Sequence, residues 1–293
     1  MPRTADAKPF TKPLWYWVLL VVLVAVIALT AVPAFTVTGG HKLQQPGAED
    51  FFPGAIFGEG TLLEFNRLTL VRVVMGVALC LTVGVVASRI KIVPGRGQAL
   101  LEIVADFVRS NVAFTLLGNK NGRRFAPLLG TLFLGVLAMN LAGVIPGLNI
   151  AASSVVAVPM VFAALTYITF IGAGIKEQGV GHFFASQLMP PGLPKVMYLL
   201  ITPIEFLSNF IVRPVTLTLR LLCNMVSGHM LLGMTFFGTT SLLLHLQASS
   251  TISVLTGAAM IVMTLFEVFV AVLQAYIFTI LSAVYIKLSI EAH

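Results

Sequence analysis

Residues 213–232, RPVTLTLRLLCNMVSGHMLL, carry charged and amide side chains in a stretch that is otherwise apolar enough to lie in a lipid bilayer. An arginine at the centre of a membrane helix costs about 2.5–3.5 kcal/mol on insertion scales. Arginine also cannot avoid this cost by losing its proton. Arg220 must therefore face a carboxylate, water or backbone carbonyls, either in a structural salt bridge within a helix bundle or in an ion pathway.

Helical spacing divides the polar side chains of this stretch between two faces. Arg213, Arg220, Asn224 and Ser227 are spaced by seven, four and three residues, which places them on one face of a helix. His229 follows Arg220 by nine residues, which at about 100° per residue puts it on the opposite side. We therefore predict one cationic face and one face that carries a histidine, which titrates near neutral pH.

A second apolar stretch supplies a matching pair. Glu267 and Gln274 are seven residues apart in FEVFVAVLQAYIF and share a helical face, and Glu267 is the one acid in the apolar run 251–288. Near His229 or water, an intramembrane carboxyl group can take up and release protons, whereas the alternative is a packing contact with a hydroxyl group or a histidine. A glutamate and a histidine in the membrane with a fixed arginine are typical of a proton route.

Composition places these residues in a membrane protein. Of 293 residues, 58% are hydrophobic and 10% are charged, whereas a soluble domain has about 25% charged residues. The net charge of +7 is typical of cytoplasmic loops in such a chain, and nucleic acid is not expected as a partner. Cys80 and Cys223 lie in apolar runs and are predicted to be small buried residues, with a disulfide as the alternative. We find no short nucleotide or metal signature and expect no cofactor.

The apolar runs predict about six membrane-spanning helices. The first, 14–32, has an aromatic start typical of the membrane interface, although VPA at 32–34 also resembles the cleavage site of a signal peptide. Residues 36–66 are rich in glycine, proline and acids and are predicted to be an outer loop. The next three spans are expected at 68–88, 125–145 and 153–173.

Between the second and third spans, residues 97–117 predict an amphipathic helix on the membrane surface. Its polar face consists of Glu102, Asp106 and Arg109, and its apolar face of Leu101, Val104, Val108 and Val112. Lysine and arginine are concentrated in the segments 89–96 and 120–124 on either side of it and occur again in 174–195, and these segments are assigned to the cytoplasm together with both termini.

The last two apolar stretches, 196–237 and 251–288, are too long for simple spans. At 1.5 Å per residue each exceeds the roughly 30 Å thickness of the hydrocarbon core. Such helices fit only by tilting strongly or by breaking, and Pro214 predicts a kink in the first. The predicted fold is thus an all-α polytopic membrane protein with two long, tilted helices at its end and one surface helix.

Two of these stretches carry the motifs of a known family. RPVTLTLRLLCNMVSGHML resembles the RPxSLxLRLxxNMxxGHxL signature of subunit a of F-type ATP synthases, and LQAYIFTILSAVYI resembles the LQAxIFxxLxxxY motif of its last helix. GQALLEIVADFV is similar to the family's surface helix, and FAPLLGTLFLGVLAMNLAGVIPG to its following span. The resemblance covers most of 64–293. It implies an a-subunit-like domain at 67–293, preceded at 1–66 by an extra membrane anchor and outer loop.

The resemblance implies a proton-translocating subunit that provides two half-channels beside a ring of c subunits. Its implied partners are this c-ring, the b subunits of the peripheral stalk, the rest of the ATP synthase complex and the lipid bilayer. The chain would be non-catalytic alone and multi-pass in the bacterial plasma membrane. A stand-alone cation/proton antiporter would instead predict internal repeats and usually an intramembrane aspartate, and we find neither in the predicted spans; a structural anchor would make the polar residues replaceable.

Carried over motif by motif, the family assigns roles to six residues. Arg220 faces the ring carboxylates, Asn224 and Gln274 are its polar neighbours, and His229 and Glu267 line the outer half-channel. Asn140, in the MNL of the third span, is a further channel-lining residue. Glu205 resembles the acid that precedes the arginine motif, but its spacing to Arg213 is one residue longer than in the family.

Overall fold

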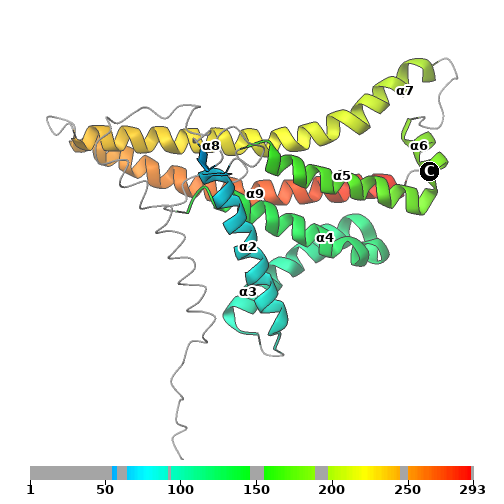
Figure 1. Cartoon of the computed structure of the whole chain (residues 1–293), viewed down its shortest axis with the longest axis horizontal. Helices are drawn as coiled ribbons and strands as arrows, with labels where there is room; N and C mark the ends of the chain where they lie inside the picture. Colours follow the sequence, from blue (N-terminus) through cyan, green and yellow to red (C-terminus); the bar gives the residue numbers. More distant parts are fainter. Residues whose placement is uncertain are drawn as a thin grey trace, which may run out of the picture.

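The computed structural model describes residues 55–57, 65–91, 94–145, 155–188, 197–244 and 250–291, mostly as long helices (Figure 1). Within these residues, five segments are long and apolar enough to cross a membrane: Leu68–Ser88, Gly97–Leu141, Ala157–Gln178, Tyr198–Thr235 and Ile261–Ile290. They correspond to the five spans predicted after residue 66. The additional span predicted at 14–32 lies outside the described residues.

The helices follow one another in the order α2 Arg67–Ser88, α3 Arg96–Val108, α4 Thr115–Leu141, α5 Ala157–Gln178, α6 Val180–Leu188, α7 Tyr198–Phe206, α8 Arg213–Leu244 and α9 Ser250–Ile290. Two π-helical turns are inserted, η2 at Arg109–Phe114 and η4 at Leu207–Val212. The predicted polytopic, all-α membrane fold is confirmed.

The predicted outer loop contains two short strands near its end. The strands β1 (Ala55–Phe57) and β2 (Phe65–Asn66) pair in antiparallel orientation. The Asn66 side chain then caps α2, since its Oδ1 accepts hydrogen bonds of 2.9 Å from the backbone N–H and from the hydroxyl of Thr69. The prediction of a loop is therefore wrong for these residues, because strands this short leave no alternation to recognise.

The spanning helices are not all parallel to one another. In Figure 1, α4, α5, α8 and α9 lie roughly along one direction, which α2 crosses steeply. The 22 residues of α2 make a helix of about 33 Å, close to the roughly 30 Å of a bilayer core. The 41 residues of α9 make one of about 60 Å. A helix of this length exceeds the thickness of the bilayer core, so the tilt expected for the last two helices stays a prediction.

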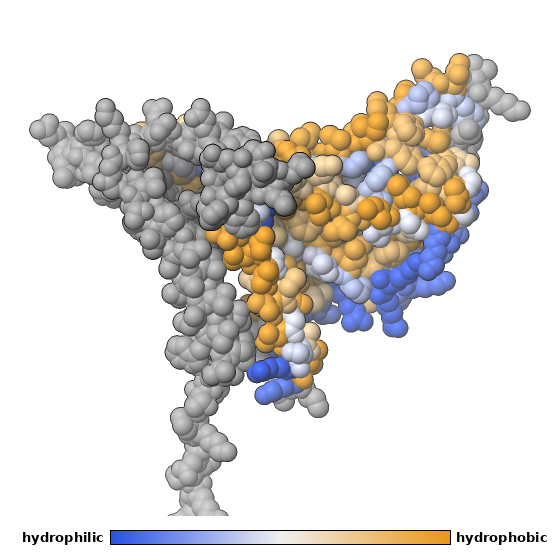
Figure 2. Space-filling model, in the orientation of Figure 1, coloured by the Kyte–Doolittle hydropathy of each residue, from blue (hydrophilic) through white to orange (hydrophobic). Residues whose placement is uncertain are grey.

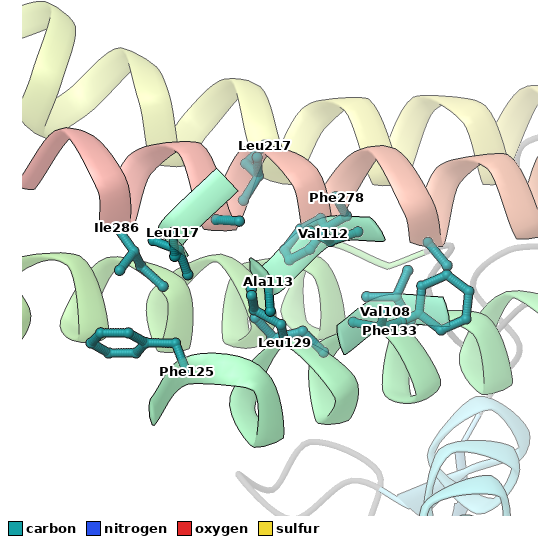
Figure 3. Packing of buried hydrophobic residues seen from close by; sticks show 14 of the residues in the cluster. Val108, Val112, Ala113, Leu117, Phe125, Leu129, Phe133, Leu217, Phe278 and Ile286 are labelled. Atoms are coloured by element: carbon teal, nitrogen blue, oxygen red, sulfur yellow. The ribbon is translucent and has the colours of Figure 1, made fainter. Parts of the chain in front are cut away.

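The core lies between α4 and α9, with side chains from η2 and α8 (Figure 3). Phe133 of α4 and Phe278 of α9 are among its buried members. Along α9, Ala271, Ala275 and Ala283 are fully buried, and small residues of this kind let membrane helices approach closely. The outer surface over these helices is largely hydrophobic (Figure 2), as expected for contact with lipid.

The predicted surface helix runs from Arg96 through η2 to Leu117. Val108 and Val112 are buried, whereas Glu102, Asp106 and Arg109 are exposed, so its two faces are as predicted. The helix then ends in a sharp reversal, which the sequence pattern did not predict. At Gly118 the backbone takes φ 71° and ψ 177°, and the chain turns back so that α4 packs on η2.

Gly118→Ala is expected to lower the free energy of unfolding by about 1–3 kcal/mol, because this backbone conformation is essentially restricted to glycine. Gly130→Ala is the matched control, since Gly130 lies in the same helix with open space around it and has no positive φ. Thermal unfolding of the detergent-purified protein, followed by circular dichroism, compares the two variants. Equal melting temperatures would contradict a strained reversal at Gly118.

Candidate functional site

The two polar stretches singled out in the sequence lie side by side. The helices α8 and α9 pack along their length (Figure 1). Because α8 runs away from the end of the bundle where the C-terminus lies, His229 is farther from that end than Arg220 (Figure 1). This packing brings the polar residues together as two cross-helix pairs.

The first pair joins a histidine of α8 to the glutamate of α9. His229 Nδ1 lies 3.3 Å from Glu267 Oε1, and the two side chains are 14% and 5% exposed. The second carboxylate oxygen, Glu267 Oε2, is buried and has no hydrogen-bond partner in the described structure. A buried oxygen of this kind is a place where water or a proton can bind. Glu267 is thus in contact with His229, one of the neighbours considered for it in the sequence.

The second pair joins two amides. Asn224 Nδ2 donates a hydrogen bond of 2.8 Å to Gln274 Oε1. Gln274 is 2% exposed, and its Nε2 is buried without an acceptor in the described part of the chain. The pair therefore crosses from α8 to α9 and leaves one donor available to water or to an incoming group.

Arg220 is exposed on the outer surface of α8. Within the described residues it has no hydrogen bond, ion pair or ring contact, which excludes a salt bridge to any of them. Val215 and Leu219 on the same helix are each 47% exposed, so the charge emerges on a partly apolar surface. In a membrane, a cation in this position requires water or a partner from another protein.

Arg213 was expected to share a helical face with Arg220, but its side chain has a different environment. Its Cζ is 5.4 Å from the centroid of the Tyr285 ring of α9, within cation–π range, and its Nη1 is buried. The physical reason is the set of partners beside Arg213, since the Tyr285 ring of α9 and residues of α5 surround it. The two arginines thus have separate environments.

Close to Pro214, where a kink was predicted, the chain forms the π-helical turn η4, directly before α8. A wider turn relieves the clash between a proline ring and the carbonyl four residues earlier. Because η4 lies between Glu205 and Arg213, it also accounts for their long spacing. Eight α-helical residues would turn the chain by about 800°, leaving the two side chains about 80° apart, whereas seven would leave them about 20° apart. A π-turn accommodates one extra residue and so reduces this offset.

Asn140 is 1% exposed near the C-terminal end of α4, on a different helix from the two pairs. Cys80 and Cys223 are free, but both are exposed, so the expectation that they are buried is wrong. Each stands on a surface that lipid or another protein covers in a membrane. Sequence reasoning missed Asn209, although an amide within the apolar run 198–212 is a signal that could have identified it.

The described fold is that of a polytopic α-helical membrane protein with polar groups between its last two helices. The sequence profile of the family described as ATP synthase A chain matches residues 69–287. An ATP synthase subunit a from Rhodococcus erythropolis is 38% identical over 259 residues, which are 88% of this chain and 94% of the relative. One from Frankia alni is 43% identical over 199 residues, 68% of each chain.

The chain belongs to the ATP synthase A chain family. It is accordingly a multi-pass subunit a of the membrane part, Fo, of a bacterial F-type ATP synthase, as the resemblance of its two motifs implied.

Proposed function

We propose that this chain translocates protons by providing two half-channels beside a ring of c subunits, with Arg220 between them. The observation that carries the proposal is the exposure of Arg220 on a partly apolar face of α8 without a partner in the described structure. A permanent cation in a bilayer is stable only where an anion or water meets it. A carboxylate carried on the ring supplies that anion.

Arg220 couples proton flow to rotation by electrostatics. A ring carboxylate that arrives beside the guanidinium is stabilised in its ionised form, so it releases its proton there and not in lipid. The same fixed positive charge repels protons that would pass directly between the half-channels. Protons must then travel with the ring for most of a turn.

The cross-helix pairs supply the proton path to the ring. His229 and Glu267 pass protons inward from the outer side, and the partnerless Oε2 of Glu267 is a site for proton uptake. Asn224, Gln274 and Asn140 hold the water that continues the path. The bond chemistry of ATP synthesis takes place elsewhere in the complex, so the chain itself is non-catalytic.

The end of the bundle where α4 begins is proposed to face the cytoplasm, where the b subunits of the peripheral stalk also reach it. Arg124 of α4 and Glu177 of α5 form a salt bridge of 2.8 Å, so two of the segments assigned to the cytoplasm lie together. The C-terminus lies at the same end (Figure 1), and we propose that the N-terminus is cytoplasmic too.

The proposal predicts that the exposed face of α8 contacts the c-ring. With both native cysteines replaced by alanine, Leu219→Cys is labelled with a photoactivatable maleimide in membranes that contain the assembled complex. Illumination should give a covalent adduct with a c subunit, identified by mass spectrometry, because Leu219 adjoins Arg220 and is 47% exposed.

Val77→Cys on α2 is the matched control, since Val77 is 51% exposed on a helix that packs on α4 and α3 and is expected to face lipid. It should give no c-subunit adduct. Adducts of equal yield from both positions, or adducts with lipid alone from Leu219→Cys, would refute this placement of the ring.

A further inference from the structure

A small cavity lies among α5, η4, the start of α8 and α9, away from the two cross-helix pairs. Its lining includes Tyr167, Asn209, Arg213 and Tyr285. The cavity volume is about 10 Å³, close to the roughly 10–15 Å³ that one buried water requires. The cavity is therefore large enough for one water and too small for an organic ligand.

Three polar atoms of residues that line this cavity are buried without a hydrogen-bond partner in the described structure. They are Arg213 Nη1, Tyr167 Oη and Asn209 Oδ1. Leaving one such group unsatisfied costs about 1–3 kcal/mol, and more where the group is charged. Because all three residues line the same cavity, one molecule bound there is a candidate for their common partner.

The orientation of the Asn209 amide is fixed by its other contacts. Its Nδ2 donates hydrogen bonds of 3.0 Å to the carbonyl oxygen of Gln187 and 3.0 Å to Glu205 Oε2. Exchanging the amide nitrogen and oxygen would place an acceptor against both of these acceptors. Asn209 is 3% exposed, and its Oδ1 is therefore an acceptor in need of a donor.

We propose that this cavity binds one structural water, held by Arg213, Tyr167 and Asn209. Water accepts from Arg213 Nη1, donates to Asn209 Oδ1 and exchanges a hydrogen bond with the Tyr167 hydroxyl, which matches the roughly three bonds typical of a buried water. A small anion would suit Arg213 and Tyr167 but would repel Asn209 Oδ1. Together with the Tyr285 ring, this water holds the guanidinium of Arg213 toward α9.

High-resolution cryo-electron microscopy of the assembled ATP synthase tests the site directly. One density peak is expected about 3 Å from each of the three atoms. An empty cavity, a peak near only one of these atoms, or elongated density from a lipid or additive would overturn the proposal.

Two variants make the test specific. Ala163→Val should remove the peak, because Ala163 lines the cavity and is 3% exposed. Ala164→Val is the matched control and should keep the peak, because Ala164 is the next residue along the chain and is exposed. If Ala163→Val prevents assembly, Tyr167→Phe keeps the shape of the ring and removes one partner. The peak should then weaken and the Arg213 guanidinium should shift, and an unchanged peak and guanidinium would contradict the assignment.

Discussion

Arg220→Ala is expected to abolish ATP-driven acidification of inverted membrane vesicles while the complex remains assembled. Without the guanidinium, a ring carboxylate would have to ionise in the bilayer without a counter-charge, which costs about 2.5–3.5 kcal/mol on insertion scales. That cost lowers the population of the ionised carboxylate on the order of 100-fold. The measurement is the quenching of a pH-sensitive dye after addition of ATP, at equal amounts of assembled complex.

Arg220→Lys distinguishes charge from geometry at the same position. Lysine supplies a point charge without the planar fork of five donors, and it can lose its proton in a low-dielectric site. Partial pumping is therefore expected. Ile168→Ala, at a residue of α5 that is 67% exposed, is the control and should pump normally. Undiminished pumping by Arg220→Ala would reduce Arg220 to a structural charge and would refute the proposed mechanism.

Glu267→Gln should slow proton pumping on the order of 100-fold, the effect typical of losing a positioned proton-transfer group. Glutamine keeps the size of the side chain and its contact with His229 but cannot take up and release a proton. The initial rate of acidification measures the effect. Glu177→Gln, the same change in the exposed salt bridge with Arg124, is the matched control and should have little effect.

Exchanging the two residues tests whether they act as a pair. Since His229 Nδ1 and Glu267 Oε1 are 3.3 Å apart, the double variant His229→Glu with Glu267→His keeps an acid and a histidine in contact. It should pump faster than Glu267→Gln, because effects at residues in contact are not additive. A double variant as slow as Glu267→Gln would show that the roles depend on the individual positions.

The sequence was sufficient for the features that depend on hydrophobic length and helical period. The bounds Leu68–Ser88 were predicted because an apolar run flanked by polar residues leaves little choice in a bilayer. The faces of the surface helix followed from a period of 3.6 residues. A polar neighbour for Glu267 was expected because a titratable acid in an apolar helix needs one, but the sequence left histidine, water and a hydroxyl group as candidates.

Other features depend on contacts between segments distant in sequence. The reversal at Gly118 depends on one backbone conformation, which GNKNG permits but does not require. Arg213 and Arg220 have equivalent positions in the helical period. The side chain of Arg213 nevertheless lies toward α9, because partners on α5 and α9 surround it. The hydrogen bond from Asn224 to Gln274 likewise requires the register of α8 against α9, which no single-helix pattern contains.

The π-turn at Leu207–Val212 has a consequence for how the chain tolerates changes in length. An extra residue in a regular helix rotates everything beyond it by about 100° and would turn Arg220 away from its outward position. Here the wide turn between α7 and α8 takes up one extra residue, which limits this rotation. A chain one residue shorter at this turn can therefore present the same arginine face from a regular α-helix.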